Sequence, residues 1–254
     1  MRQVVDTETA KEFMTETLDR VDVAELARIA SELEAKSAWF QEHLSAERWE
    51  SFTPALWAEA VEKIFSARRN RKLLLEEADF SAVHAAIGVL LHDGDPIEDR
   101  FDAFTAAFDG LPVNTRRDLA SELLHFTFPD RYWLWTRWMW DPKTRTGALP
   151  LVISVEHDLT GETDGEIYMK VGRGLAFVHQ VGDGAGFKRI SHSVFGTDVF
   201  LCCVYVIYAY TVLKMRMTKE FNKVMPELAA FCRRLLGVYD RKHDASRATA
   251  TPGT

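Results

Sequence analysis

Apolar residues recur at helical spacing through the first half of this chain. Leu26, Ile29, Leu33 and Phe40 lie near the 3.6-residue period that places side chains on one face of a helix. This pattern predicts a helix over residues 22–44. Similar patterns predict helices over residues 55–68 and 115–128, so we expect the first half of the chain to be entirely helical.

Residues that start and stop helices support this interpretation. Thr9-x-x-Glu12 has the form of a capping box, and Thr53-Pro54 has the form of an N-cap followed by a first helical residue. Further start signals are Asp79, Asp95-Pro96 and Asn114, and the stop signals are Gly94, Gly110 and Pro129. The connections between these helices are short, which favours a compact bundle.

The pattern changes near residue 149. Residues 149–155 and 166–171 have the composition of strands, and the polar residues 160–165 between them suit a hairpin connection. We therefore expect a small β-hairpin insertion near residues 149–171. The glycine-rich residues 172–186 lack the spacing of a phosphate-binding loop, so we interpret them as turns.

Helical patterns return over residues 198–217 and 227–236, the second opened by Pro226 and closed by Gly237. The predicted fold is mainly α, with a single compact multi-helix domain. Its parts are an N-terminal helical half (1–148), a β-hairpin and glycine-rich insertion (149–197), C-terminal helices completing the same domain (198–239) and a disordered tail (240–254).

The most apolar segment runs from Val199 to Leu213 without a formal charge. Its fifteen residues are fewer than the roughly 20 that a bilayer-spanning helix needs. It also contains three tyrosines. We expect a central helix covered by protein and no membrane span.

Composition and charge narrow the class of protein. Of 254 residues, 47% are hydrophobic and 27% are charged, as in ordinary globular proteins, and the net charge of −7 disfavours a surface that coats nucleic acid. Cys202, Cys203 and Cys232 lie in apolar segments, which suits a reducing compartment. Acidic residues stand where a secretory signal would need basic and apolar ones, so we expect a cytoplasmic location.

Candidate chemistry is sparse. Glu122 and His125 lie one helical turn apart, but a di-iron site needs a second Glu-x-x-His pair, and the sequence has none. We therefore expect His125 to be a buried, hydrogen-bonded residue, and we predict no metal and no cofactor. No catalytic residues can be named, because the sequence lacks a nucleophile elbow and its cysteines lie in apolar segments.

The densest feature is aromatic. Four of the seven tryptophans lie between Phe126 and Trp140. Whether this run is helical or extended, both of its faces are aromatic, so it must be covered on two sides. The favoured cover is the rest of the chain, and the other is a partner, since large apolar patches are rarely left exposed.

Three hypotheses follow. The first is a non-catalytic cytoplasmic accessory or scaffold protein that docks a protein partner, or its own copy, through residues 131–140. The second is a nucleic-acid-binding module that uses the same rings with Arg131, Arg137, Lys143 and Arg145, and the basic run at residues 68–72 could also contact phosphate. The third is an enzyme with an unrecognised helical active site. The predicted partner-binding residues are Arg131, Tyr132, Trp133, Arg137 and Trp140.

Overall fold

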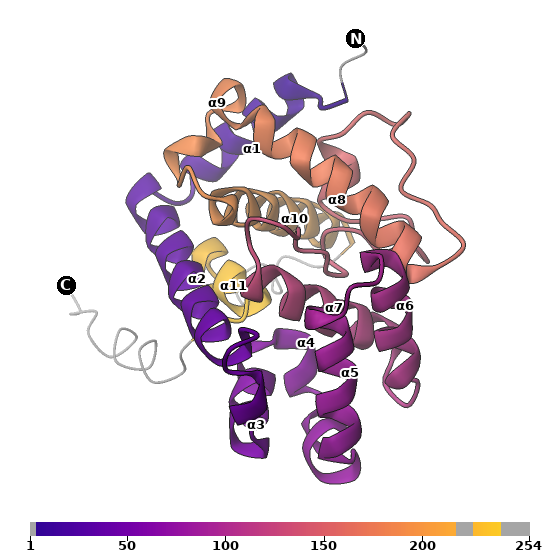
Figure 1. Ribbon diagram of the computed structural model, residues 1–254. Helices are drawn as coiled ribbons and strands as arrows, with labels where there is room; N and C mark the ends of the chain where they lie inside the picture. Colours follow the sequence, from indigo (N-terminus) through magenta and orange to yellow (C-terminus); the bar gives the residue numbers. More distant parts are fainter. Residues whose placement is uncertain (1–3, 217–225, 240–254) are drawn as a thin grey trace, which may run out of the picture.

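The computed structural model describes residues 4–216 and 226–239, and this part of the chain is mainly helical, as predicted (Figure 1). The α-helices are α1 (Thr7–Leu18), α2 (Val23–Leu44), α3 (Pro54–Lys63), α4 (Phe65–Arg68), α5 (Phe80–His92), α6 (Ile97–Ala107), α7 (Val113–Thr127), α8 (Asp164–Gln180), α9 (Gly182–Ala185), α10 (Val194–Arg216) and α11 (Leu228–Leu235). Short 3-10 or π turns are η1 (Trp49–Ser51), η2 (Leu73–Glu77), η3 (Leu149–Leu151) and η4 (Phe187–Arg189).

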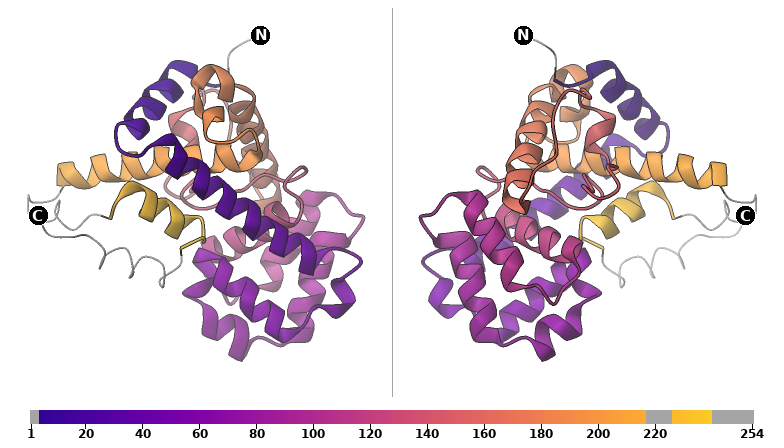
Figure 2. Two further views of the ribbon diagram at one scale, coloured as in Figure 1. Left: turned by 90° about the vertical axis from the view of Figure 1, so that its left-hand side faces the viewer. Right: turned by 90° about the vertical axis from the view of Figure 1, so that its right-hand side faces the viewer.

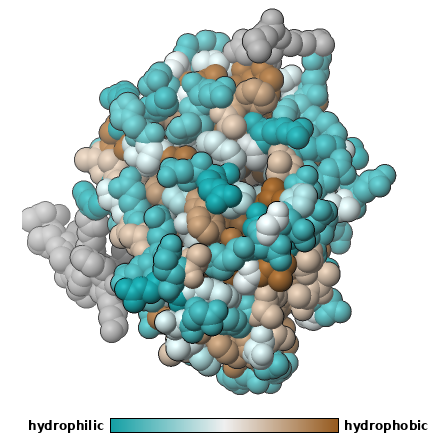
Figure 3. Space-filling model, viewed as in Figure 1, coloured by the Kyte–Doolittle hydropathy of each residue, from teal (hydrophilic) through white to brown (hydrophobic). Residues whose placement is uncertain are grey.

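The helices form one body around two buried elements, α7 and α10. Helices α3 to α7 group at one end of the molecule, and α1, α8 and α9 at the other (Figure 1). Helix α2 runs between the two groups and packs against α7, α10 and α11, while α10 crosses the molecule (Figure 2). The outer face in Figure 3 is mostly hydrophilic with scattered apolar residues, as expected of a folded domain.

Helix α11 ties the end of the described chain to its beginning. Arg233 pairs with Glu25 at 2.6 Å and with Glu32 at 2.7 Å, both on α2. The carbonyl of Leu236, just after α11, accepts a hydrogen bond at 3.0 Å from Lys36, also on α2. Contacts across about 200 residues therefore close the fold.

The predicted helix starts at Asp22, Thr53-Pro54 and Asp79 are confirmed, whereas Asn114 lies inside α7, which begins at Val113 after Pro112. Asp22 caps α2 by accepting from Glu25 N at 2.7 Å, and Thr53 with Pro54 starts α3. The capping box at Thr9 is wrong, because α1 begins at Thr7 and Asp6 caps it by accepting from Thr9 N at 3.0 Å. The expected helix over 55–68 is divided at Ile64, whose backbone is extended between α3 and α4.

The predicted β-hairpin near residues 149–171 is wrong. The described residues hold isolated bridges and no strand; residues 149–151 form η3, and residues 166–171 lie inside α8. The buried residues Ile167, Val171, Leu175 and Val178 follow the helical period over a longer window than the six residues that suggested a strand. Thr163 caps this helix by accepting from Glu166 N at 3.1 Å.

The glycine-rich residues 172–186 are helical in their first part, since Gly172 and Gly174 lie within α8. Gly186 has a φ of 85° and separates α9 from η4, as expected of glycine in a turn. Gly165, at the start of α8, allows close packing on α6, because a Cβ there would lie 2.1 Å from the carbonyl oxygen of Glu98.

Helix α10 occupies the centre of the fold. Within the described residues, Val194–Val212 is the single helical stretch long and apolar enough to cross a membrane, and 72% of its most apolar part is buried inside the protein. The core helix of a soluble protein can have this length and composition. Cys202, Cys203 and Cys232 are free and buried. The predicted tail, 240–254, lies outside the described residues.

Candidate functional site: two clefts beside the tryptophan segment

Residues 131–140, here the tryptophan segment, form turns and irregular structure, neither helix nor strand. The segment runs beside α7 in the opposite direction: His125 contacts Tyr132, Ser121 contacts Trp135, and Asp118 contacts Arg137. Neither the helical nor the extended geometry considered from the sequence is the observed one.

A polar stripe on α7 supplies the hydrogen bonds that a strand would have made. Asp118 Oδ1 accepts from Arg137 N at 2.9 Å, and Ser121 Oγ accepts from Trp135 N at 2.5 Å. His125 Nδ1 lies 2.8 Å from the carbonyl oxygen of Tyr132, and its Nε2 lies 2.9 Å from Asp198 Oδ2. Buried backbone groups need such partners, so this stripe allows an irregular segment to pass through the interior.

The rest of the chain covers most of the tryptophans. Trp135 stacks on Phe101 at 5.8 Å between ring centroids and donates its indole N–H to the carbonyl of Trp140 at 2.9 Å. Trp140, 5% exposed, donates its own indole N–H to the carbonyl of Leu159 at 3.1 Å. Trp140 is therefore a core residue in this structure and does not reach the surface.

Three of the five predicted partner-binding residues line one cleft. This α8 cleft has a volume of about 230 Å³. Its lining residues are Arg131, Tyr132, Trp133, Tyr168, Met169, Gly172, Arg173 and Ala176. The Trp133 indole lies against Gly172, where an added Cβ would be 3.5 Å from its Cδ1, and its ring centroid is 5.6 Å from that of His179.

The rim of the α8 cleft carries two arginines without a carboxylate partner in the described part of the chain. Arg131 lies over the rings of Phe128 and Tyr132, at 5.6 and 5.3 Å from their centroids. Arg173 is exposed, and Phe177, one turn further along α8, is 38% exposed. The cleft is therefore bordered by unpaired positive charge and by the half-buried rings of Tyr132 and Trp133.

Arg137 lies in a separate cleft of about 460 Å³, here the Arg137 cleft. Its walls come from residues 65–70, the first turns of α7, the loop after the tryptophan segment, α10 and α11. They are Phe65, Ser66, Arg69, Asn70, Asn114, Thr115, Asp118, Arg137, Trp138, Asp141, Thr144, Thr146, Tyr205 and Leu235. The structure thus divides the predicted set between two clefts and the core.

The two carboxyl groups in the Arg137 cleft, those of Asp118 and Asp141, differ in their surroundings. Burial, followed by the nearby Glu122 charge, raises the pKa of Asp118 well above its usual value, so the neutral acid is favoured. Asp141 accepts from Arg137 Nε at 3.0 Å and from the backbone N–H groups of Lys143 and Thr144 at 3.0 and 3.4 Å. Lys143 and Arg145 are exposed in the following turn and line neither cleft.

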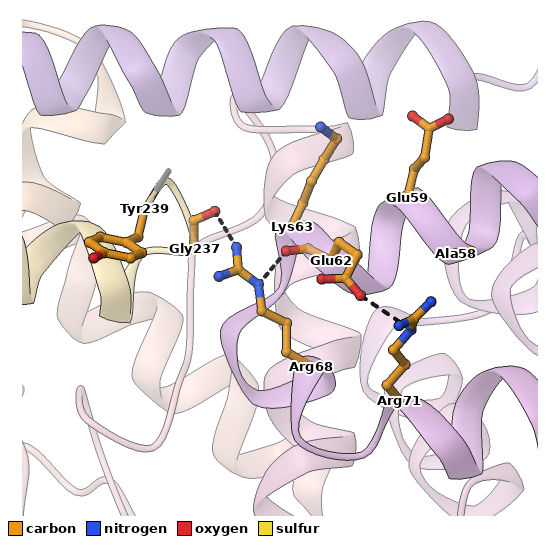
Figure 4. A pocket seen from close by; sticks show the side chains of 8 residues that line it. All are labelled: Ala58, Glu59, Glu62, Lys63, Arg68, Arg71, Gly237 and Tyr239. Atoms are coloured by element: carbon orange, nitrogen blue, oxygen red, sulfur yellow. Dashed lines mark hydrogen bonds and ion pairs between the residues drawn. The ribbon is translucent and has the colours of Figure 1, made fainter. Parts of the chain in front are cut away.

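The largest of the three clefts, about 580 Å³, lies beside α3 and the basic run at residues 68–72 (Figure 4). Arg68 donates to the backbone carbonyls of Glu62 and Gly237, and Arg71 pairs with the Glu62 carboxylate at 3.3 Å. Lys72 pairs with Glu77 at 3.1 Å. These cations are engaged by the protein itself, so this cleft is a weaker candidate.

Sequence reasoning missed Asp118, Ser121 and Arg173. The first two share a helix face with His125 at spacings of three and four residues, and this polar stripe on an otherwise buried helix was the signal available. Arg173 was hidden by the expectation of a loop after residue 171. In the part of the chain that the structure describes, no three His, Cys, Asp or Glu residues are grouped to hold a metal ion.

Comparisons with known proteins assign no relative. No protein-family model matches the chain, and no curated protein or solved structure matches it significantly.

Proposed function

We propose that this chain is a non-catalytic cytoplasmic accessory or scaffold protein that docks a protein partner through the α8 cleft. The observation that carries the proposal is the pairing of two arginines that lack carboxylate partners among the described residues, Arg131 and Arg173, with the partly exposed rings of Tyr132 and Trp133. Arginine and large aromatic residues are enriched in protein interfaces and in their hot spots.

The size of the cleft favours a protein side chain as its occupant. Its volume of about 230 Å³ is below the roughly 300–1,000 Å³ of typical small-molecule pockets. A partner segment that places an apolar side chain in the cleft and an acidic one beside it would contact Trp133 and pair with Arg131 or Arg173. We therefore infer a partner surface that is acidic and apolar.

A single-stranded nucleic acid is less well supported. Base stacking needs an aromatic face that is open to solvent. One side of Trp133 lies against Gly172, and the ring also neighbours His179. Lys143 and Arg145, which the nucleic-acid hypothesis also uses, lie outside the cleft.

The test compares two charge-reversed variants with the wild type. Arg131→Glu/Arg173→Glu changes the α8 cleft, while Lys143→Glu/Arg145→Glu makes the same charge change on an exposed turn. Proteins captured from the native host are identified, and the affinity of each recombinant candidate is then measured. We expect the cleft variant to lose a partner that the turn variant keeps, with both variants folded by circular dichroism.

Two results would refute this function. One is a set of captured proteins that is the same for all three forms, with no self-association by sedimentation. The other is binding to single-stranded oligonucleotides that weakens steeply with salt and falls in both variants, which would support the nucleic-acid alternative.

A further inference from the structure

We propose that the Arg137 cleft is a second binding site, one that takes a small phosphate monoester carried on a flat ring system. The phosphate would lie at the start of α7 between Arg69 and Arg137. This site is distinct from the α8 cleft and does not depend on the docking function.

Two guanidinium groups are available to a phosphate in this cleft. Arg69 differs from its neighbours in the basic run, because it has no carboxylate or carbonyl partner in the described ranges and lies 5.6 Å over the Phe65 ring. Arg137 uses Nε to bind Asp141, and its side chain remains 62% exposed. Its two terminal nitrogens can therefore donate to a ligand, and arginine suits phosphate because its fork of donors matches the oxygens.

The start of α7 adds backbone donors. This 15-residue helix follows Pro112, which provides no side-chain cap, and the N–H groups of Val113 and Asn114 have no backbone acceptor among the residues described. Asn114 and Thr115 line the cleft. Uncapped amides at a helix N-terminus favour anions through their donors and the helix dipole.

Trp138 contributes an apolar wall to the cleft and, among the described residues, an unpaired donor beneath it. Its ring lines the cleft and is 6% exposed, yet its indole Nε1–H is buried without an acceptor in the described structure. Buried polar groups are rarely left unpaired in folded proteins. This donor lies beneath the cleft surface, so a ligand acceptor reaches it only when the indole ring shifts.

The two acidic residues of the cleft leave it with a net positive charge. The pKa of Asp118 is raised well above its usual value by burial and by Glu122, so its carboxyl group favours the uncharged form and can donate a hydrogen bond. Asp141 already accepts from the Arg137 side chain and two backbone N–H groups. Asp141 offsets one positive charge, so the net attraction for an anion is that of a single arginine charge.

The part of the cleft that a phosphate does not fill indicates what the rest of the ligand is. The cleft measures about 460 Å³, within the range of small-molecule sites and larger than one phosphate group requires. Phe65, Trp138, Tyr205 and Leu235 supply apolar walls. A flat ring system attached to the phosphate would contact these side chains.

The experiment uses adenosine monophosphate as the probe in isothermal titration calorimetry, with the full chain and constant ionic strength. Adenosine and inorganic phosphate are titrated separately to isolate the two halves of the ligand. The variant is Arg69→Ala, and the matched control is Arg71→Ala, which removes the same charge two residues away outside the cleft. Partner capture with Arg69→Ala should be unchanged, which separates this proposal from the docking function.

We expect the wild type to bind adenosine monophosphate more tightly than inorganic phosphate or adenosine. Arg69→Ala should weaken binding by roughly tenfold, the effect of losing one charge-assisted contact, while Arg71→Ala stays within about twofold of wild type. The proposal is overturned if the wild type binds neither phosphate-bearing probe. It is also overturned if both variants weaken binding equally, or if phosphate alone binds as tightly as the monophosphate.

Discussion

The ion pair between Lys36 and Glu122 gives the sharpest test of how this fold is held together. Lys36 Nζ lies 2.7 Å from Glu122 Oε2, and both side chains are 4% exposed. Lys36 also donates to the carbonyl of Leu236 and lies 3.9 Å over the Phe126 ring. Burial lowers the pKa of Lys36 and raises that of Glu122, while each partner's charge opposes the shift of the other.

Removing one member should destabilise the protein far more than removing both. Glu122→Ala leaves an ammonium group buried without its counter-charge, which costs about 3–5 kcal/mol of unfolding free energy. For a chain of this size each kcal/mol lowers Tm by about 2–4 °C, so the expected loss is about 6–20 °C. Lys36→Met/Glu122→Leu replaces the pair with apolar side chains and should recover most of that loss.

The measurements are urea denaturation and differential scanning calorimetry at neutral pH. Lys72→Met is the surface control, because its pair with Glu77 is exposed and should contribute less than about 1 kcal/mol. The reasoning fails if Glu122→Ala is no more destabilised than this control. It also fails if Lys36→Met/Glu122→Leu loses as much stability as Glu122→Ala.

Three further predictions concern the core, a histidine and a loop. Asp198→Asn should lower the free energy of unfolding by less than about 1 kcal/mol, because the new amide can donate to His125 Nε2. Asp198→Leu cannot form this hydrogen bond and should lower it by about 1–3 kcal/mol, as measured by urea denaturation. Equal losses for the two variants would contradict this pairing. Burial lowers the pKa of His92 below 6.5, so its contribution to stability is present above pH 6.5 and declines as the pH falls below it. Stability measured between pH 7 and 5 should therefore decrease more for wild type than for His92→Gln, and parallel curves would rule this out. Gly147→Ala should lower the free energy of unfolding by more than about 2 kcal/mol, because a Cβ there would lie 2.2 Å from the Met139 carbonyl oxygen. Gly110→Ala is the control and should be nearly neutral, because its Cβ would meet no atom within 4 Å. Similar losses for the two variants would show that the loop can move to accommodate the Cβ.

Helices that combine apolar residues at 3.6-residue spacing with an N-cap residue could be predicted from the sequence. Asp22 and Thr53 are examples, because an N-cap acts on residues two or three positions away. The error at residues 166–171 arose because Ile167, Tyr168 and Val171 have strand propensity, while the helix depends on burial further along the chain. Propensity over six residues was overridden by packing against α6.

The candidate site could be predicted only in part. The composition of the tryptophan segment identified a region where Arg131 and Arg137 lie on accessible surface. The composition did not show that Arg131 and Arg137 line different clefts. The α8 cleft has walls from α8, and the Arg137 cleft has walls from α4, α7 and α10, all outside the tryptophan segment. The burial of Trp140 has the same cause, since its cover is the distant Leu159.

The contacts of α11 have a consequence for synthesis on the ribosome. Helix α2 is synthesised about 200 residues before the residues that complete its contacts. These are Arg233, which pairs with Glu25 and Glu32, and Leu236, whose carbonyl accepts a hydrogen bond from Lys36. Until Arg233 and Leu236 have been added, a nascent chain can form α2 but cannot complete its packing. Domains generally fold as whole units during synthesis, so we expect this protein to acquire protease resistance only after residue 236 has left the ribosome.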